Sequence, residues 1–286
     1  VFRCRLGLPA TARSRTDHLD RERTTLSAKH PYSSHSLVQP HMDVRVKGTV
    51  APDPFLSAAD LLETEYSLSR PVDVHVRTDP DERTWAAHYD DHHVLNISRQ
   101  AATSVLAREL ALHEFAHMAR YEQRHASHTQ STEEALFLAL AGESVERRKL
   151  THCYQIANHM KDIYADDITL SLAPATRLVD FFASKLATAI SEHNGDNAPV
   201  SPVETKGSAP GMTVVNAAFA LALVERHGLV GSDHRLYELA DTAADVAPGV
   251  DLAAFKRRFK SLGDDPTESE YRQSLVEMTR AYATAE

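Results

Sequence analysis

The first third of the chain carries apolar residues that alternate with polar ones. The alternation runs through residues 42–50, 71–78 and 92–98. A period of two is typical of β-strands that bury one face. Residues 56–68, between the first two of these segments, have the spacing of a short helix instead. The pattern therefore predicts three strands and one helix before residue 99.

From about Arg99 the spacing of the apolar residues changes from two to 3.6, the period of an α-helix. No Pro or Gly occurs between Pro80 and Gly142, so nothing interrupts a long helix that continues through residue 120. Further helices are predicted at 133 to about 164, at 175–193, and from near Thr213, Ser232, Leu252 and Thr267. This order predicts an α+β fold, in which a small β-sheet packs on one helix and a mainly α-helical C-terminal region follows.

Two segments lack such periodicity and divide the chain. Residues 1–41 carry seven of the 31 basic residues and only three of the 40 acidic ones. We expect this segment to be disordered, as a basic arm or transit peptide, or to be translated upstream sequence before a true start at Met42, which we favour. Residues 194–211 are polar and rich in Pro and Gly, which predicts a linker or exposed loop. A catalytic domain at 42–193 and a helical region at 212–286 are thereby predicted.

The composition excludes several classes of protein. The net charge is −9 and there is a single Trp, so a nucleic-acid surface is not expected. No apolar run reaches the roughly 18 residues that span a bilayer, and we expect no membrane partner. Two cysteines exclude a disulfide framework and favour a cytoplasmic location. The acid excess after residue 41, with 37 acidic against 24 basic residues, also suits a protein that stays soluble in high salt.

One short motif carries recognisable chemistry. His113, Glu114 and His117 have the spacing His-Glu-x-x-His within the predicted long helix. Residues four apart share one helical face, so both imidazoles can bind one Zn²⁺ at about 2.0–2.1 Å. Glu114 flanks the metal and can act as general base toward a water whose pKa the zinc lowers to about 7. The motif predicts a hydrolytic zinc site.

The surroundings of the motif support that interpretation. Leu106, Leu110 and Tyr121 continue the face of the two histidines, so this face is apolar except at the motif. The strand predicted at 92–98 comes directly before the helix and could bind an extended peptide by edge pairing. The alternative is that both histidines are capped or solvated side chains that happen to share a helix.

The motif, with a strand before it and helices after it, resembles the zincin metallopeptidases. The resemblance covers roughly residues 70–150 and implies bound zinc, Glu114 as general base and hydrolysis of peptide bonds. The wider sequence from 113 to 167 also resembles an uncharacterised family of proteins from salt-loving archaea, which implies no activity.

A zinc site needs a third protein ligand. The short run of three histidines that some zincins use is absent, and the resemblance then implies a gluzincin-like pattern, with a glutamate from the next helix. The candidates are Glu133, Glu134, Glu143 and Glu146. Ser131 and Glu134 form a capping-box pattern, which gives Glu134 a structural role. We choose Glu143, because Gly142 beside it allows two helices to approach closely, and keep Glu146 as the alternate. Both glutamates could instead form exposed ion pairs.

Two further groups of side chains could bind a metal. His152, Cys153 and His159 are ligand types on one predicted helix, although packing and surface positions explain them more simply. Residues 90–93 (Asp-Asp-His-His) suit a polar turn before a strand better than a metal site.

Three acidic residues lie near the end of the helix predicted at 133–164. Asp162, Asp166 and Asp167 suggest a solvated helix end. The alternative is that one of them binds the second nitrogen of a metal-ligating histidine and fixes its orientation.

The sequence thus favours a zinc-dependent metallopeptidase that acts on a peptide or protein substrate. The alternative function is a catalytically silent zincin-like sensor or scaffold that binds metal, and a third is a helical interaction protein without metal. The sequence predicts neither the cleavage specificity nor the oligomeric state.

Overall fold

The computed structural model describes residues 41–79, 83–194 and 209–285. The segment before residue 41 and most of the predicted linker at 194–211 lie outside the described residues. Within them, four strands and eleven helices form an α+β fold, as the sequence predicted. None of the described helices combines the length and the apolar character that a membrane span requires.

The four strands form one mixed sheet. They are β1 (Val44–Lys47), β2 (Val72–Arg77), β3 (Trp85–His88) and β4 (His93–Ser98), in the spatial order β1-β2-β4-β3. Strands β1, β2 and β4 are parallel to one another, and β3 runs antiparallel to β4 at the edge. The sequence predicted β1, β2 and β4, but β3 was missed because Trp-Ala-Ala-His shows no alternation.

The position of β4 corrects one expectation. The segment 92–98 was expected to offer its edge to a peptide, but β4 has β2 on one side and β3 on the other. Every residue of β4 is buried. The open edge beside the motif helix belongs to β3.

The helices before residue 123 differ in their bounds from the prediction. The first, α1 (Asp53–Leu62), begins earlier and ends sooner than the segment 56–68. The prediction of one continuous helix from Arg99 is wrong, because α2 (Arg99–Ala102) and α3 (Ala107–Glu122) are separate helices. The hydroxyls of Thr103 and Ser104 donate to the carbonyls of Arg99 and Ala101, which competes with helix continuation.

The helix predicted at 133–164 is also interrupted. After α4 (Ala126–Thr129), α5 (Thr132–Leu140) ends before Gly142, whose φ of +83° lies in the left-handed region that favours glycine. The next helix, α6 (Arg147–Leu172), continues past the predicted end and spans about 39 Å at 1.5 Å per residue. The remaining helices lie close to prediction: α7 (Thr176–Asn194), α8 (Pro210–Arg226), α9 (Arg235–Val246), α10 (Leu252–Lys260) and α11 (Glu268–Ala283).

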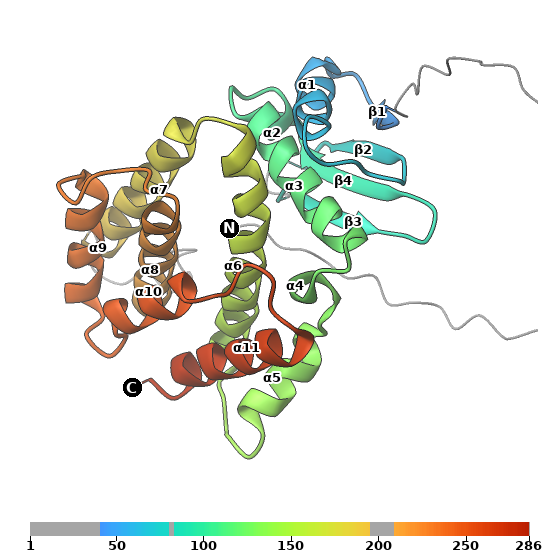
Figure 1. Ribbon diagram of the computed structural model, residues 1–286. Coiled ribbons are helices and arrows are strands. Elements are labelled where there is room, and N and C mark those ends of the chain that lie inside the picture. The colour runs from blue at the N-terminus through green and yellow to red at the C-terminus, as the bar shows by residue number, and fades with distance from the viewer. Residues whose placement is uncertain (1–40, 80–82, 195–208, 286) are drawn as a thin grey trace, which may run out of the picture.

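Helix α6 runs through the middle of the molecule (Figure 1). On one side lie the sheet, α1 and α3, and on the other lie α7 to α10, with α5 and α11 near the N-terminal half of α6. Ala165 and Ile168 of α6 belong to the apolar cluster of the sheet, α1 and α3. Ile156 and Met160 belong to a second cluster with α5, α8, α10 and α11. The described helices after residue 209 therefore share an apolar core with α6.

A partly buried ion pair also joins α6 to the C-terminal helices. Arg226 donates to both carboxylate oxygens of Asp167 at 2.8 and 2.9 Å, and to the carbonyl of Leu262 at 2.7 Å. His227 donates to the same carboxylate at 2.9 Å. Burial raises the pKa of Asp167, but the hydrogen bonds from His227 and Arg226 outweigh it, and the pKa lies below its usual value.

Replacing Arg226 should test this ion pair. Arg226→Met should lower the free energy of unfolding by about 3 kcal/mol, because it leaves a largely buried carboxylate without its guanidinium partner. The pKa of Asp167 is depressed, so its stabilisation is present above the unfolded value of about 3.9 and is lost as the pH falls through the folded value. Urea unfolding between pH 3 and 7 should therefore show a difference from wild type that shrinks below about pH 4.

The control is Arg177→Met, which removes an exposed pair with Glu109 and should cost less than about 1 kcal/mol. Equal losses in both variants would contradict the assignment.

Candidate metal centre

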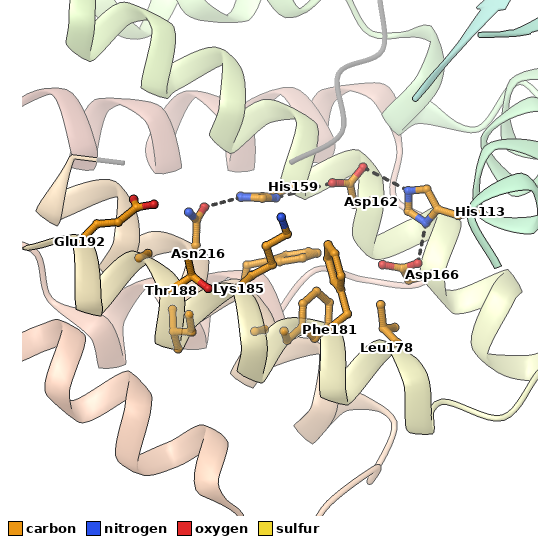
Figure 2. A pocket seen from close by; sticks show the side chains of 15 residues that line it. His113, His159, Asp162, Asp166, Leu178, Phe181, Lys185, Thr188, Glu192 and Asn216 are labelled. Atoms are coloured by element: carbon orange, nitrogen blue, oxygen red, sulfur yellow. Dashed lines mark hydrogen bonds and ion pairs between the residues drawn. The ribbon is translucent and has the colours of Figure 1, made fainter. Parts of the chain in front are cut away.

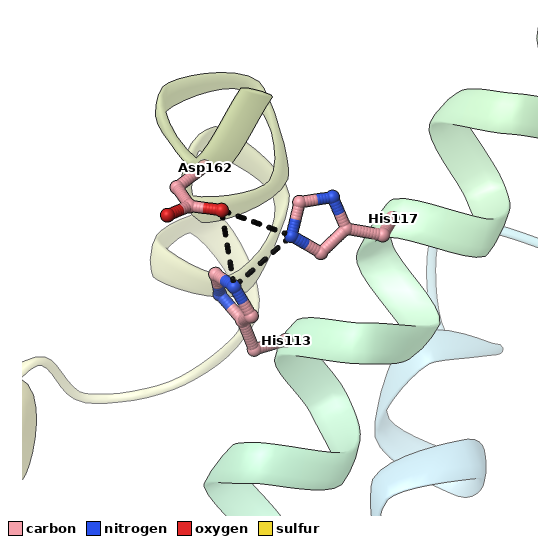
Figure 3. Close-up of side chains that lie close together, drawn as sticks. All are labelled: His113, His117 and Asp162. Atoms are coloured by element: carbon pink, nitrogen blue, oxygen red, sulfur yellow. Dashed lines mark hydrogen bonds and ion pairs between the residues drawn. The ribbon is translucent and has the colours of Figure 1, made fainter. Parts of the chain in front are cut away.

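Helix α3 buries both motif histidines because it lies between the sheet and α6. His113 is 7% exposed and His117 is 2% exposed. Their rings lie one helical turn apart on the face that meets α6, and their Nε2 atoms are 3.1 Å apart (Figure 3). The sequence correctly placed these two nitrogens side by side.

Asp162 of α6 completes the group from the opposite helix (Figure 3). Its Oδ1 lies 3.3 Å from Nε2 of His117 and 3.8 Å from Nε2 of His113. Among the described residues, these three side chains form the one cluster of His, Cys, Asp or Glu whose ligand atoms converge as a metal site requires. Ligands about 2.0–2.1 Å from a tetrahedral metal are about 3.3–3.4 Å apart, and the three separations lie around that value.

A second carboxylate of α6 orients His113. Its Nδ1–H donates to Oδ1 of Asp166 at 2.7 Å, and the Thr169 hydroxyl donates to the same oxygen at 3.1 Å. Burial opposes a charged ring, but Asp166 and Asp162 outweigh it and raise the pKa of His113 well above its usual value. Because Nδ1 faces Asp166, Nε2 is the nitrogen turned toward Asp162 and His117.

His117 is oriented by a chain of hydrogen bonds that ends on a backbone carbonyl. The carbonyl of Asp264 can only accept, so Nε2–H of His125 donates to it at 3.3 Å. The Ser127 hydroxyl then donates to Nδ1 of His125, and Nδ1–H of His128 donates to that hydroxyl, each at 2.7 Å. Burial lowers the pKa of His128 well below its usual value, so its Nε2 is an acceptor. Nδ1–H of His117 must therefore donate to it, at 2.7 Å.

The nitrogens that face away from these partners are directed at one point. The Nε2 atoms of His113 and His117 lie 3.8 and 3.3 Å from Oδ1 of Asp162 and 3.1 Å from each other. Two nitrogens and a carboxylate oxygen this close together, with little access to water, require a positive charge among them. A proton can supply that charge, in agreement with the raised pKa of His113. A metal ion in place of the proton would bond to all three atoms, so the residues present fit a metal ion.

Glu114 reaches the same region from the sheet side of α3. It is 1% exposed, and the backbone amide of Ala86 on β3 donates to its carboxylate. Its Oε1 is buried and has no hydrogen-bond partner among the described residues. Burial raises the pKa of the Glu114 carboxyl, against the effect of His117 and His113. An unsatisfied carboxylate oxygen here suits a group that receives a proton from a water.

A cavity of about 270 Å³ opens beside the group (Figure 2). His113, Asp162 and Asp166 line one end of it. His159 lies 3.5 Å from Oδ2 of Asp162 through its Nδ1, and its Nε2–H donates to Oδ1 of Asn216 on α8 at 2.8 Å. The group is therefore buried in the protein but adjoins an open space.

The structure does not bring the predicted third ligand to the histidines. Glu143 and Glu146 are exposed between α5 and α6, where the break at Gly142 leads the chain away from α3. Glu133 and Glu134 are exposed in the first turn of α5, and the Ser131 hydroxyl caps that helix. Asp162 lies where Glu143 was expected; both residues fall in the single helix predicted at 133–164, which the structure divides into α5 and α6.

The other candidate ligands are also kept apart. His152 contacts the hydroxyl of Tyr282 at 2.7 Å, while Cys153 is buried against the carbonyl of Thr279. His159 faces Asn216 and Asp162 instead. Within the segment 90–93, His92 pairs with Asp91 at the surface and His93 contacts Glu122 of α3.

The three aspartates of α6 do not lie at a helix end, since α6 continues to Leu172. Asp166 fulfils the alternative, as the partner of a motif histidine. The position of Asp162 beside the motif histidines was missed, although two acids one turn apart on a predicted helix were a visible signal. The part of His128 was also missed, because only a three-dimensional turn brings it back to His117.

The comparisons with known proteins assign no activity. A family model described as a family of unknown function (DUF5781) matches residues 42–284. No curated protein and no solved structure matches the chain.

The ligand assignment can be tested with two matched carboxylate-to-amide variants. Asp162→Asn should weaken metal affinity by more than about 100-fold, because the amide cannot supply the anionic ligand. Glu143→Gln should leave the affinity unchanged, since that side chain is exposed and distant. Competition with a chelating dye measures both. A loss in Glu143→Gln with none in Asp162→Asn would restore the glutamate ligand.

The hydrogen bond from His113 to Asp166 predicts a smaller loss of metal affinity than the one expected for Asp162→Asn. Asp166→Asn should reduce metal affinity by about 10–100-fold, because the amide orients and polarises the imidazole less well. Asp167→Asn, one residue later, should lower thermal stability without this loss of affinity, because Asp167 pairs with Arg226 and His227. If the two variants bind metal equally, Asp166 does not act through His113.

Proposed function

The chain belongs to the family of unknown function that matches residues 42–284, and we propose that it is a zinc-dependent peptidase. The observation that carries the proposal is the convergence of Nε2 of His113, Nε2 of His117 and Oδ1 of Asp162, together with the buried Glu114, whose charge interacts with both histidines and whose Oε1 has no hydrogen-bond partner among the described residues. Glu114 acts as general base, and the three converging side chains hold the metal.

The donor set favours zinc among the common divalent ions. Magnesium and calcium prefer six or more oxygen ligands, whereas two imidazoles and one carboxylate are a set that catalytic zinc sites use. Three protein ligands leave the fourth tetrahedral position for a water or substrate. The cavity beside His113 and Asp162 provides space next to that set.

The chemistry at the site divides between the ion and the chain. A zinc ion held there would act as a Lewis acid and lower the pKa of a water to about 7. The chain supplies the proton acceptor, Oε1 of Glu114. This oxygen is buried and has no hydrogen-bond partner among the described residues. The Ala86 amide fixes the carboxylate, so the base does not need to be ordered during the reaction.

The sheet supports a peptide as the substrate. β3 is an edge strand, and no other strand of the described residues pairs with its outer side. An extended peptide added there would form backbone hydrogen bonds and would pass close to Glu114, which the Ala86 amide holds against the same strand. The edge-pairing hypothesis thus moves from β4 to β3.

A catalytically silent metal protein is the alternative function. The same buried contacts would hold a structural cation and tie α3 to α6, with no use for Glu114. The two functions differ in what the replacement of Glu114 does, because only the peptidase needs an ionisable carboxylate at that position.

Glu114→Gln should keep stoichiometric zinc and lower kcat/KM on a fluorogenic peptide library by at least about 100-fold, the usual contribution of general base catalysis. Metal analysis and peptide cleavage measured on the same preparation check both parts. Glu143→Gln serves as the matched control and should retain wild-type cleavage. Wild-type protein that holds zinc but cleaves no peptide would establish the silent alternative, and cleavage that persists in Glu114→Gln would place the activity elsewhere.

A further inference from the structure

The cavity beside the metal group lies between α6, α7 and α8. One end is lined by His113, Asp162 and Asp166, while Glu192 lies at the other end (Figure 2). Two of the three converging side chains therefore contribute to its wall. A substrate bound at the metal group would extend directly into this space.

Most of the wall between those ends is apolar. Leu178, Phe181, Phe182 and Leu186 lie on one face of α7, with the spacing of a helical stripe, and Phe219 and Ala220 face them from α8. Leu178, Phe181 and Phe182 are only half-buried. When an apolar group fills an open space lined in this way, apolar surface is removed from water, which is favourable.

The charges around the cavity do not favour an ionic ligand. Lys185 and Glu192 are both exposed, and they oppose each other in sign. The ammonium of Lys185 lies 5.6 Å from the centre of the Phe181 ring and forms no hydrogen bond or ion pair within the described part of the chain. The wall thus selects mainly by apolar contact and shape.

We propose that this cavity binds one bulky apolar side chain of the substrate, next to the bond that is cleaved. The inference rests on the proposed peptidase function and names its substrate class: peptides with a large aliphatic or aromatic residue at that position. The volume supports one side chain, since a cavity of about 150 Å³ in another protein holds a benzene molecule. Whole small-molecule ligands occupy pockets of about 300–1,000 Å³.

Two hydroxamates separate the cavity from the metal group. Both bind zinc through the same atoms, but phenylalanine hydroxamate carries a benzyl side chain that glycine hydroxamate lacks. Calorimetry on the zinc-loaded full chain should show phenylalanine hydroxamate binding about ten- to a hundredfold tighter, the gain expected from burying one aromatic side chain. Equal affinities for the two probes, with zinc present, would overturn the proposal.

Filling the cavity gives the matched test. Ala189 lines the cavity and belongs to none of the apolar clusters, so Ala189→Phe should occupy the space without disturbing the core. The affinity ratio of the two probes should fall close to one, while glycine hydroxamate binding and zinc content stay unchanged. Ala187→Phe, on the same helix beside another depression, should keep the wild-type ratio. If Ala189→Phe does not fold, Phe181→Ala removes part of the wall and should reduce the ratio several-fold.

The outcomes distinguish the two proposals. An unchanged ratio in folded Ala189→Phe and Phe181→Ala overturns the cavity assignment and leaves the peptidase proposal intact. The expected ratios in a protein that cleaves no peptide support the cavity and overturn the peptidase. A chain that binds neither zinc nor hydroxamate overturns both.

Discussion

The contact between α3 and α6 imposes a strict electrostatic condition on the fold. It buries His113 and His117 against Asp162 and Asp166, and an unpaired charge in such a place costs several kcal/mol. The hydrogen bonds engage both Nδ1 atoms and turn the two Nε2 atoms toward each other and toward Oδ1 of Asp162. The condition is met when a cation lies among these three atoms, and the packing of the two helices then depends on the chemistry of the site.

Helix α6 transmits this condition to the rest of the fold. Its N-terminal part packs in the apolar cluster of the C-terminal helices, and its C-terminal part packs against the cluster of the sheet. Hydrogen bonds from His159 to Asn216 and from Arg226 to Asp167 fix its rotation about its own axis. The carbonyl of Asp264, more than 100 residues after the motif, anchors the chain of hydrogen bonds that orients His117. The C-terminal helices are therefore part of the metal group's support.

In the proposed peptidase, different elements do different tasks. α3 would supply two nitrogen ligands and the base, and α6 would supply the carboxylates that complete and orient the ligands. β3 fixes Glu114 through the Ala86 amide and offers the open edge. α7 and α8 enclose the apolar cavity, which gives the proposed peptidase a means of choosing among peptides. A metal held for structure alone would not need Glu114, the edge of β3 or the apolar cavity.

The sequence by itself determined what depends on local spacing. A period of two gave three of the four strands, and a helical spacing of four placed His113 and His117 on one face, because neighbours along a strand or helix fix these geometries. It missed β3, whose four residues have no pattern and which exists through its pairing with β4. Tertiary structure alone decided which carboxylate lies beside the two histidines. Glu143 was chosen because Gly142 adjoins it, but Glu143 is exposed between α5 and α6, and Asp162 reaches the histidines where α6 packs on α3. His128 and Asp166 acquire their roles in the same way, since contacts between distant segments depend on how helices pack and leave no fixed spacing in the sequence.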